Sequence, residues 1–93
     1  MRENKIEAKL KQMVEKQGGI APKFVSPGLS GMPDRLVLLP GGQIAFVEVK
    51  APDKVPRPLQ EARHRMLRKL GFKVYVLDDA GQIGGILDEI RAT

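Results

Sequence analysis

The chain has 93 residues, which is enough for one domain and leaves little room for a second core. It has no cysteine, which excludes disulfides, thiolate metal sites and a cysteine nucleophile. The net charge of +5 suits a protein that binds an anionic polymer such as nucleic acid, and it equally suits a cationic surface that only aids solubility.

The chain starts with charged residues, without the apolar stretch of a signal peptide. No segment approaches the roughly 20 apolar residues that span a bilayer. We therefore expect a cytoplasmic protein without a membrane partner.

A helix is predicted over residues 2–17, and two glycines end it. Its apolar residues recur at helical spacing: Ile6, Leu10, Met13 and Val14. A short strand is expected over residues 23–26, followed by a loop over residues 27–33 that is rich in glycine and proline.

Two strands follow, over residues 35–39 and 44–50, and both are rich in residues that favour strands. The connection Pro40-Gly41-Gly42-Gln43 is short and contains glycine, so the two strands should form a hairpin. A charged loop with three prolines follows.

A second helix should begin near Pro58 and end at Gly71. Its predicted inward stripe is Leu59, Ala62, Met66, Leu67 and Leu70. A last strand over residues 72–77 precedes a short third helix, capped by Asp78 or Asp79. The third helix should bury Ile83, Ile86, Leu87 and Ile90.

The crossover helix between the hairpin and the last strand requires a parallel pair of strands. The expected fold is therefore a single α/β domain over residues 1–93. Its mixed sheet would have four strands and be flanked by helices, in the order α-β-β-β-α-β-α.

The tripeptide Glu-x-Lys occurs three times, and only one copy is placed to act as a site. On a helix, residues two apart point about 200° away from each other, so the copies beginning at residues 3 and 7 cannot converge. On a strand, residues two apart share a face. Glu48 and Lys50, at the end of an apolar strand, therefore point the same way.

Asp34 begins the neighbouring strand, and the hairpin loop decides whether it meets Glu48. A two-residue Gly41-Gly42 turn would set Asp34 opposite Val49, on the wrong face. A three-residue loop would set Asp34 opposite Glu48 or Lys50, depending on which residues form the loop. A site at this place therefore requires the longer loop.

Two carboxylates on adjacent strands can hold one or two hard cations such as Mg²⁺. The Val49 carbonyl lies between Glu48 and Lys50 and could add a third oxygen, and Lys50 could orient a water or offset charge on phosphorus. The alternative is an exposed strand end with surface ion pairs, each worth at most about 1 kcal/mol.

The combination of Gly31-Met32-Pro33-Asp34, Phe46-Val47-Glu48-Val49-Lys50 and Gln60 resembles the signature of the VRR-NUC domain, the virus-type replication–repair nuclease. That domain belongs to the PD-(D/E)xK nuclease superfamily, which implies a restriction-endonuclease-like core. The resemblance covers nearly the whole chain.

The resemblance implies that Asp34, Glu48 and the Val49 carbonyl bind Mg²⁺ or Mn²⁺. It also implies that Lys50 is the catalytic lysine and that Gln60 reaches back toward the metal. Glu7 would be the acidic residue of the first helix, with Glu3 as an alternative one turn earlier. The alternative is that both glutamates pair with lysines on the same helix.

Four residues are candidates for contacting DNA. Lys54 and Arg57 lie in the loop after the catalytic strand, and Ser30 precedes the Gly-Met-Pro-Asp turn. His64, the only histidine, lies one helical turn after Gln60 and could touch phosphate or water. The simpler readings are a structural histidine and a serine that bonds its own loop.

The resemblance implies a metal-dependent DNA endonuclease in the cytoplasm of a bacterial or virus-infected cell. Stand-alone members resemble the junction-resolving enzymes of DNA repair, so a homodimer acting on branched DNA is expected. Two alternatives are a non-catalytic nucleic-acid-binding module and a nuclease subunit of a larger repair or packaging complex.

Overall fold

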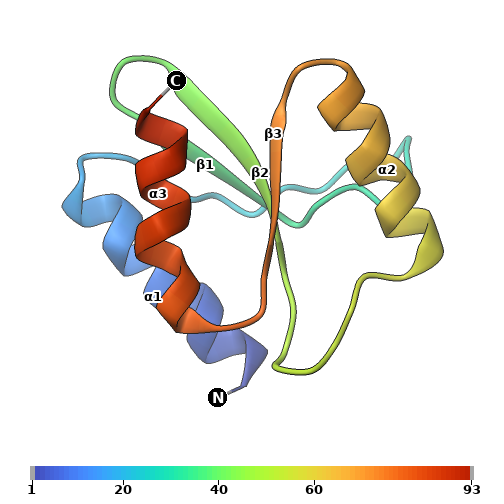
Figure 1. Cartoon of the computed structure of the whole chain (residues 1–93), viewed down its shortest axis with the longest axis horizontal. Helices are drawn as coiled ribbons and strands as arrows, with labels where there is room; N and C mark the ends of the chain where they lie inside the picture. Colours follow the sequence, from blue (N-terminus) through green and yellow to red (C-terminus); the bar gives the residue numbers. More distant parts are fainter. Residues whose placement is uncertain (1, 93) are drawn as a thin grey trace.

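The computed structural model describes residues 2–92, so Met1 and Thr93 of the predicted domain lie outside the described residues. The elements are α1 Glu3–Lys16, β1 Arg35–Leu39, β2 Gln43–Val49, α2 Pro58–Lys69, β3 Lys73–Leu77, the 3-10 turn η1 Ala80–Gln82 and α3 Ile83–Arg91. β2 lies in the middle of the sheet, antiparallel to β1 and parallel to β3. The sheet is therefore mixed, as predicted (Figure 1).

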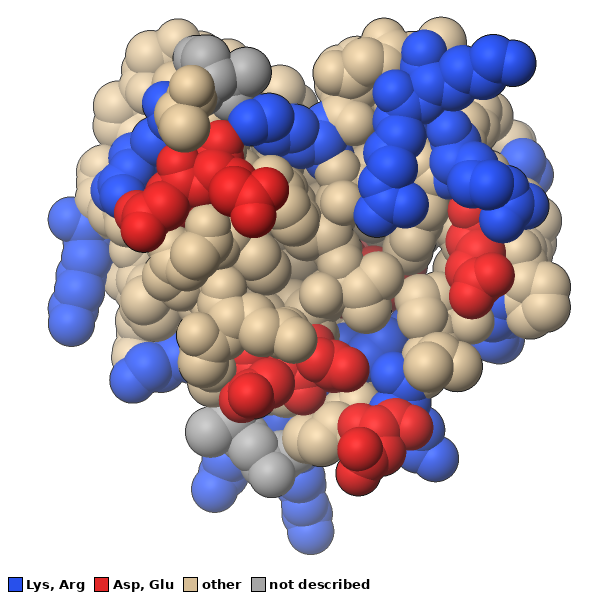
Figure 2. Space-filling model, viewed as in Figure 1, with Lys and Arg blue, Asp and Glu red and all other residues tan. Residues whose placement is uncertain are grey.

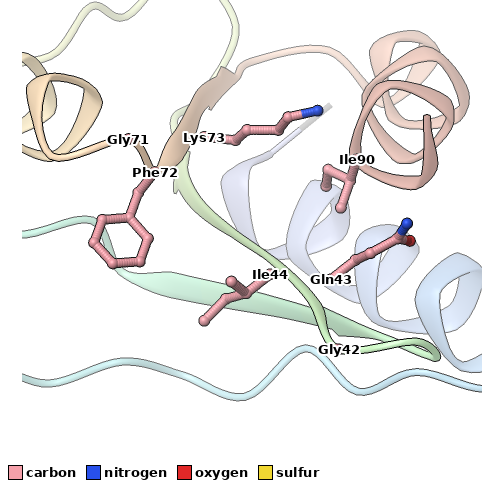
Figure 3. A pocket seen from close by; sticks show the side chains of 7 residues that line it. All are labelled: Gly42, Gln43, Ile44, Gly71, Phe72, Lys73 and Ile90. Atoms are coloured by element: carbon pink, nitrogen blue, oxygen red, sulfur yellow. The ribbon is translucent and has the colours of Figure 1, made fainter. Parts of the chain in front are cut away.

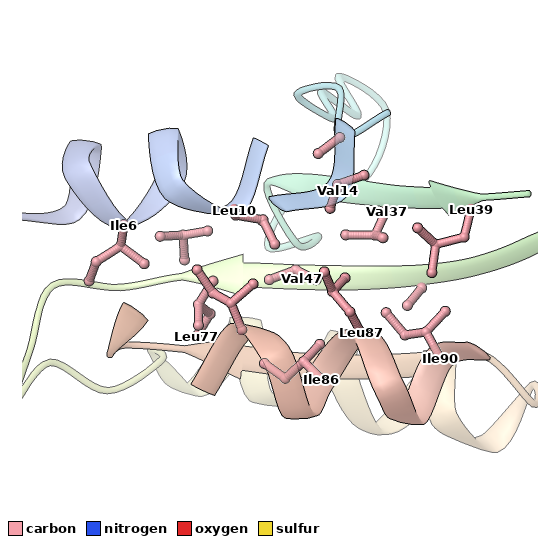
Figure 4. Packing of buried hydrophobic residues seen from close by; sticks show 14 residues of the cluster. Ile6, Leu10, Val14, Val37, Leu39, Val47, Leu77, Ile86, Leu87 and Ile90 are labelled. Atoms are coloured by element: carbon pink, nitrogen blue, oxygen red, sulfur yellow. The ribbon is translucent and has the colours of Figure 1, made fainter. Parts of the chain in front are cut away.

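The sheet separates two layers of helices: α1 and α3 lie over one face and α2 over the other (Figure 1). The larger core lies on the side of α1 and α3, where aliphatic side chains from both helices meet those of the sheet (Figure 4). The four residues predicted to be buried in the third helix are all buried there: Ile83, Ile86, Leu87 and Ile90. A smaller core under α2 contains Phe46, Leu67 and Val74.

The hairpin has the three-residue loop that a site requires. Leu39 pairs with Gln43, which leaves Pro40, Gly41 and Gly42 in the loop. Gly41 and Gly42 have φ values of 91° and 78°, in the left-handed region that glycine enters at little cost. At the other end of the hairpin, Arg35 pairs with Val47. Extended by one residue beyond the pair of Arg35 and Val47, the same register sets Asp34 opposite Glu48.

The predicted fourth strand over residues 23–26 is wrong: within residues 2–92 the sheet has three strands. The segment before β1 runs beside it and makes only two isolated bridges, Ile20 with Leu38 and Lys23 with Arg35. Between the bridges, Pro22 accepts a hydrogen bond from the Leu36 N–H through its carbonyl. It has no N–H to return, so the ladder is interrupted.

The apolar stripe predicted for the second helix is also wrong in part. Leu59 and Leu70 are 46% and 67% exposed, whereas the buried residues of α2 are Gln60, His64 and Leu67. The helix is rotated so that two polar side chains face the sheet. Their partner there is a buried carboxylate, which the next subsection describes.

Two residues after β3, the carboxylate of Asp79 accepts a hydrogen bond from the Gly81 N–H and caps η1. α3 then continues directly from this turn. Within residues 2–92, no helix combines the length and apolar character needed to cross a bilayer.

Candidate active site

Glu48 is a buried carboxylate at the end of the central strand. It is the penultimate residue of β2 and only 2% exposed. Two residues earlier on the same face, Phe46 belongs to the core under α2, so the Glu48 side chain also points toward α2. A buried carboxylate needs partners, because burial without hydrogen bonds costs several kcal/mol.

The partners come from α2. Gln60 Nε2 donates to Glu48 Oε2 at 3.3 Å, and His64 Nε2 lies 3.4 Å from Glu48 Oε1. The two residues are four apart, so they occupy successive turns of one helix face. Gln60 Oε1 accepts from the Arg57 N–H at 2.8 Å, which fixes the orientation of the amide. Each carboxylate oxygen of Glu48 is thus held by one side chain.

Asp34 reaches the same end of β2 from the turn before β1. Its Oδ1 accepts a hydrogen bond from the Val49 N–H at 3.1 Å. The N–H and C=O of one strand residue point to the same neighbouring strand, so the Val49 carbonyl also faces β1 and Asp34. The predicted oxygen donors therefore lie at one place: Asp34, Glu48 and the Val49 carbonyl.

The charge of Asp34 raises the free energy of the charged form of Glu48. Burial is the main cause that raises the pKa of Asp34, with Glu7 and Glu3 adding to the shift and the Val49 N–H opposing it. Burial and the charge of Asp34 raise the pKa of Glu48 to about 7. Like charges held this close favour either a shared proton or a bound cation.

Lys50 lies near the buried side chains of Glu48 and His64. It follows β2, where its backbone N–H donates to the Leu77 carbonyl at 2.9 Å. Its positive charge lowers the pKa of Glu48 and also that of His64. The pKa of His64 is lowered chiefly by burial and next by Arg68, which favours the neutral imidazole. Lys50 is thus a cation close to Glu48, and its catalytic role stays a prediction.

The oxygen donors at this site suit Mg²⁺ or Mn²⁺ with part of its water shell retained. They suit less well a metal whose ligands are all protein side chains. Within residues 2–92, no group of three or more His, Cys, Asp or Glu side chains is arranged to hold a metal. Mg²⁺ keeps several waters and is commonly bound by one or two carboxylates together with substrate phosphate. Asp34, Glu48 and the Val49 carbonyl provide that arrangement.

Glu7, the predicted acidic residue of the first helix, is engaged by Arg35. Arg35 Nε lies 3.3 Å from Glu7 Oε1, and Arg35 Nη1 donates to the Ala21 carbonyl at 2.6 Å. Glu7 acts on the pKa of Asp34 only, whereas Glu3 acts on those of both Asp34 and Glu48. Ligation by Glu7 remains a prediction, and Glu3 remains its alternative.

Arg35 is a buried charged residue beside the site that the sequence prediction missed, and its side chain contacts Glu7 on the α1 side of the sheet. It is only 8% exposed and lies next to Asp34. The alternation of buried residues along β1 places Arg35, Val37 and Leu39 on one face. Because Val37 and Leu39 are apolar, that alternation was a signal that Arg35 also points inward.

The four predicted DNA contacts differ in exposure. Lys54 and Arg57 are exposed in the loop after β2, and Ser30 is exposed in the loop before β1. The Ser30 carbonyl accepts from Arg63 Nε at 2.8 Å, which ties that loop to α2. His64, in contrast, is only 2% exposed and contacts Glu48. Its place is behind the carboxylate rather than at the surface.

A pocket of about 300 Å³ lies at the opposite end of the strands and is separate from this site. It is formed where the hairpin loop approaches the start of β3 and the end of α3 (Figure 3). Its lining is Gly42, Gln43, Ile44, Gly71, Phe72, Lys73 and Ile90. No carboxylate lines it, so it does not share the chemistry of Asp34 and Glu48.

Comparisons with known proteins agree with this geometry. No protein-family model matches the chain. The phage protein "Putative nuclease p44" of Acyrthosiphon pisum secondary endosymbiont phage 1 is 56% identical over 78 residues, which are 84% of each protein. A solved structure described as a VRR_NUC domain superposes with a TM-score of 0.86 at 34% identity and covers 95% of this chain and 97% of its own.

The fold and these relatives identify a nuclease domain. The chain belongs to the VRR-NUC family.

Proposed function

We propose that this protein is a divalent-metal-dependent endonuclease that hydrolyses phosphodiester bonds in DNA. The observation that carries the proposal is the paired carboxylates of Asp34 and Glu48 beside Lys50, within a VRR-NUC fold. A pure binding module would gain nothing from this pair, because carboxylates repel phosphate. The alternative of a non-catalytic module is therefore disfavoured.

Mg²⁺ or Mn²⁺ would be held by Asp34, Glu48 and the Val49 carbonyl. A metal bound there supplies Lewis-acid polarisation of the phosphate and a lower pKa for a bound water. The protein's own part is positional. Gln60 and His64 keep the Glu48 carboxylate in one orientation, and the Val49 N–H does the same for Asp34. The Lys50 ammonium can orient the attacking water and offset negative charge that develops on the phosphate.

We further propose that the working unit is a homodimer acting on branched DNA. A two-fold dimer with two sites matches the symmetry of a four-way junction and can nick opposed strands. A chain of 93 residues buries a limited core, so pairing would also add stability. The family and the phage relative support a role in DNA repair within a bacterial or virus-infected cell as part of this proposal.

The deciding experiment compares cleavage of a labelled four-way junction, a flap, a linear duplex and a single strand, with Mg²⁺, Mn²⁺ or EDTA. Wild type is compared with Glu48→Gln and Lys50→Ala. The matched controls are Glu15→Gln and Lys16→Ala, which change the same residue types on the exposed side of α1. Light scattering on the same samples gives the oligomeric state.

We expect metal-dependent paired nicks in the junction, lost in the two site variants and kept in the controls. Equal cleavage of all substrates would retain the nuclease and remove the preference for junctions. Tight binding without cleavage under any condition would favour the binding module. Activity that appears only with a co-purified partner would favour a subunit of a larger complex.

A further inference from the structure

A second, polar groove lies between α2 and the outer edge of β3. Its volume is about 280 Å³. The lining residues are Pro56, Glu61, His64, Arg65, Arg68 and Val76. Lysine and arginine side chains gather over α2 on the face that Figure 2 shows. This groove is distinct from the pocket at the hairpin end of the sheet.

The helical repeat explains why arginines line this groove. Gln60, His64 and Leu67 form the buried face of α2. Arg65 is the residue directly after His64, and Arg68 comes one helical turn after His64. Both arginines therefore lie on the flank of α2 that faces β3. β3 is an edge strand, and its outer edge offers backbone groups to that flank.

Arg68 is fixed across the groove. Its Nη2 donates to the Val74 carbonyl at 2.9 Å. A guanidinium has five N–H donors, so this bond leaves others for a ligand. Because the side chain is already ordered by Val74, an anion that binds it costs less entropy than binding to a freely moving arginine.

His64 joins the groove to the proposed active site. His64 is one of the residues that line the groove, and its Nε2 lies 3.4 Å from Glu48 Oε1. An anion in the groove is thus one side chain away from the carboxylate pair. The two arginines outnumber Glu61, so the groove carries net positive charge.

We propose that this groove binds a backbone phosphate of the nucleic acid strand that passes the active site. The inference rests on the proposed function, because it names the part of the surface that the same substrate would follow. Contacts with phosphate fix the position and orientation of the nucleic acid without reading its sequence. Arg65 and Arg68 therefore contribute affinity that falls with salt.

The test measures binding of a labelled duplex and of a four-way junction in EDTA over a series of salt concentrations. The variants are Arg65→Gln, Arg68→Gln and their combination. Each phosphate contact contributes about 0.9 to the slope of log affinity against log salt. We expect the slope to become shallower by about 1 for each arginine removed, with weaker binding to both DNAs alike.

The matched control is Lys9→Gln with Lys16→Gln, which removes two positive charges from exposed positions of α1, on the other side of the sheet. Arg68→Gln also removes the bond to Val74, so thermal unfolding is measured for every variant. The exposed Arg65→Glu variant provides a second test that leaves that bond intact.

An unchanged salt slope in the Arg65 and Arg68 variants would overturn the proposal that the groove binds phosphate, whether or not the wild type cleaves DNA. An equal loss in the α1 control would also overturn it, because the effect would then be one of net charge. If the slope changes only in the groove variants and the wild type cleaves no DNA with Mg²⁺ or Mn²⁺, the groove stands and the proposed nuclease function fails.

Discussion

Nε2 of His64 lies 3.4 Å from Oε1 of Glu48, and both side chains are only 3% exposed. An ionised carboxylate only accepts hydrogen bonds, so when Glu48 is charged this contact requires the tautomer of His64 that carries its proton on Nε2. A histidine predicted as a contact for DNA thus lies behind the site, where it orients a carboxylate of the proposed metal site.

We predict that His64→Ala lowers cleavage activity by about 10- to 100-fold, the usual cost of removing the support of a metal ligand. The loss should appear as a higher Mg²⁺ requirement and a lower kcat, with little change in KM for DNA. His64→Gln, which keeps an N–H donor, should recover part of the activity. A full Mg²⁺ titration of each variant decides the matter. An Ala variant with wild-type Mg²⁺ dependence would contradict this role.

The raised pKa of Glu48 predicts how stability depends on pH in EDTA. The pKa is about 7 in the folded protein against 4.5 for a free side chain, so the folded state binds the proton more tightly. This contribution to stability is complete below pH 4.5 and is lost as the pH rises through 7. Each pKa unit corresponds to 1.36 kcal/mol, so the loss at pH 8 is at most roughly 3 kcal/mol.

Glu48→Gln removes this proton site and serves as the reference. In urea unfolding at pH 8 with EDTA, the variant should be more stable than the wild type, and the difference should shrink toward pH 5. Mg²⁺ at pH 8 should stabilise the wild type and leave the variant almost unchanged. If the two proteins have parallel stability curves from pH 5 to pH 8, Glu48 does not have the raised pKa.

The backbone conformation at Gly31 predicts that the loop leading to Asp34 requires glycine at this position. Its φ is +83°, and an added Cβ would lie 2.7 Å from Leu59 Cγ and 3.2 Å from the Leu59 carbonyl oxygen. We expect Gly31→Ala to lower the free energy of unfolding by about 1–3 kcal/mol and to reduce cleavage as Asp34 shifts. Gly28→Ala in the same loop is the control, because an added Cβ there meets nothing within 4 Å.

Gly28→Ala should change the free energy of unfolding by no more than about 0.5 kcal/mol. Urea unfolding of both variants tests the pair. Equal effects of the two substitutions would show that the contact with Leu59 does not constrain the loop.

The ion pair of Arg35 and Glu7 predicts a coupled effect on stability. The two side chains are only 10% and 22% exposed. Removing Arg35 leaves both the Glu7 carboxylate and the Ala21 carbonyl without this donor. Arg35→Met should therefore cost about 2 kcal/mol or more, and Glu7→Gln less.

A double-mutant cycle measures this coupling. The combined variant should be less destabilised than the sum of the single changes by about 1 kcal/mol. Strict additivity would mean that the two side chains do not interact in solution. Mg²⁺ titration of Glu7→Gln on the same samples tests whether Glu7 also supports the metal.

The hairpin explains which part of the site the sequence could predict. The alternation of a strand puts Glu48 and Lys50 on one face, and this follows from the residues alone. Gly41-Gly42 suits both a two-residue and a three-residue loop, so the position of Asp34 remained open. The pairing of Leu39 with Gln43 shows that the loop has three residues, and this register sets Asp34 opposite Glu48. Local sequence thus predicted the strands, and the structure supplied their register.

The second helix shows why other parts were beyond sequence reasoning. Its leucines at positions 59 and 70 satisfy the apolar pattern, yet Gln60 and His64 are buried in their place. The cause is Glu48, a residue of another element, whose burial requires polar partners. Similarly, the sequence predicted a strand over residues 23–26, and only the neighbouring β1 shows that Pro22 interrupts the pairing there.

The same missing N–H at Pro22 affects how this sheet can meet another one. An exposed sheet edge normally recruits any strand that can complete its ladder of hydrogen bonds. Here the segment over residues 20–24 runs along the outer side of β1, and its proline disfavours further pairing. At the opposite edge, Arg68 occupies the Val74 carbonyl. Each edge thus carries a feature that disfavours the addition of a strand, so we expect any homodimer to form through side chains rather than through a continuous sheet.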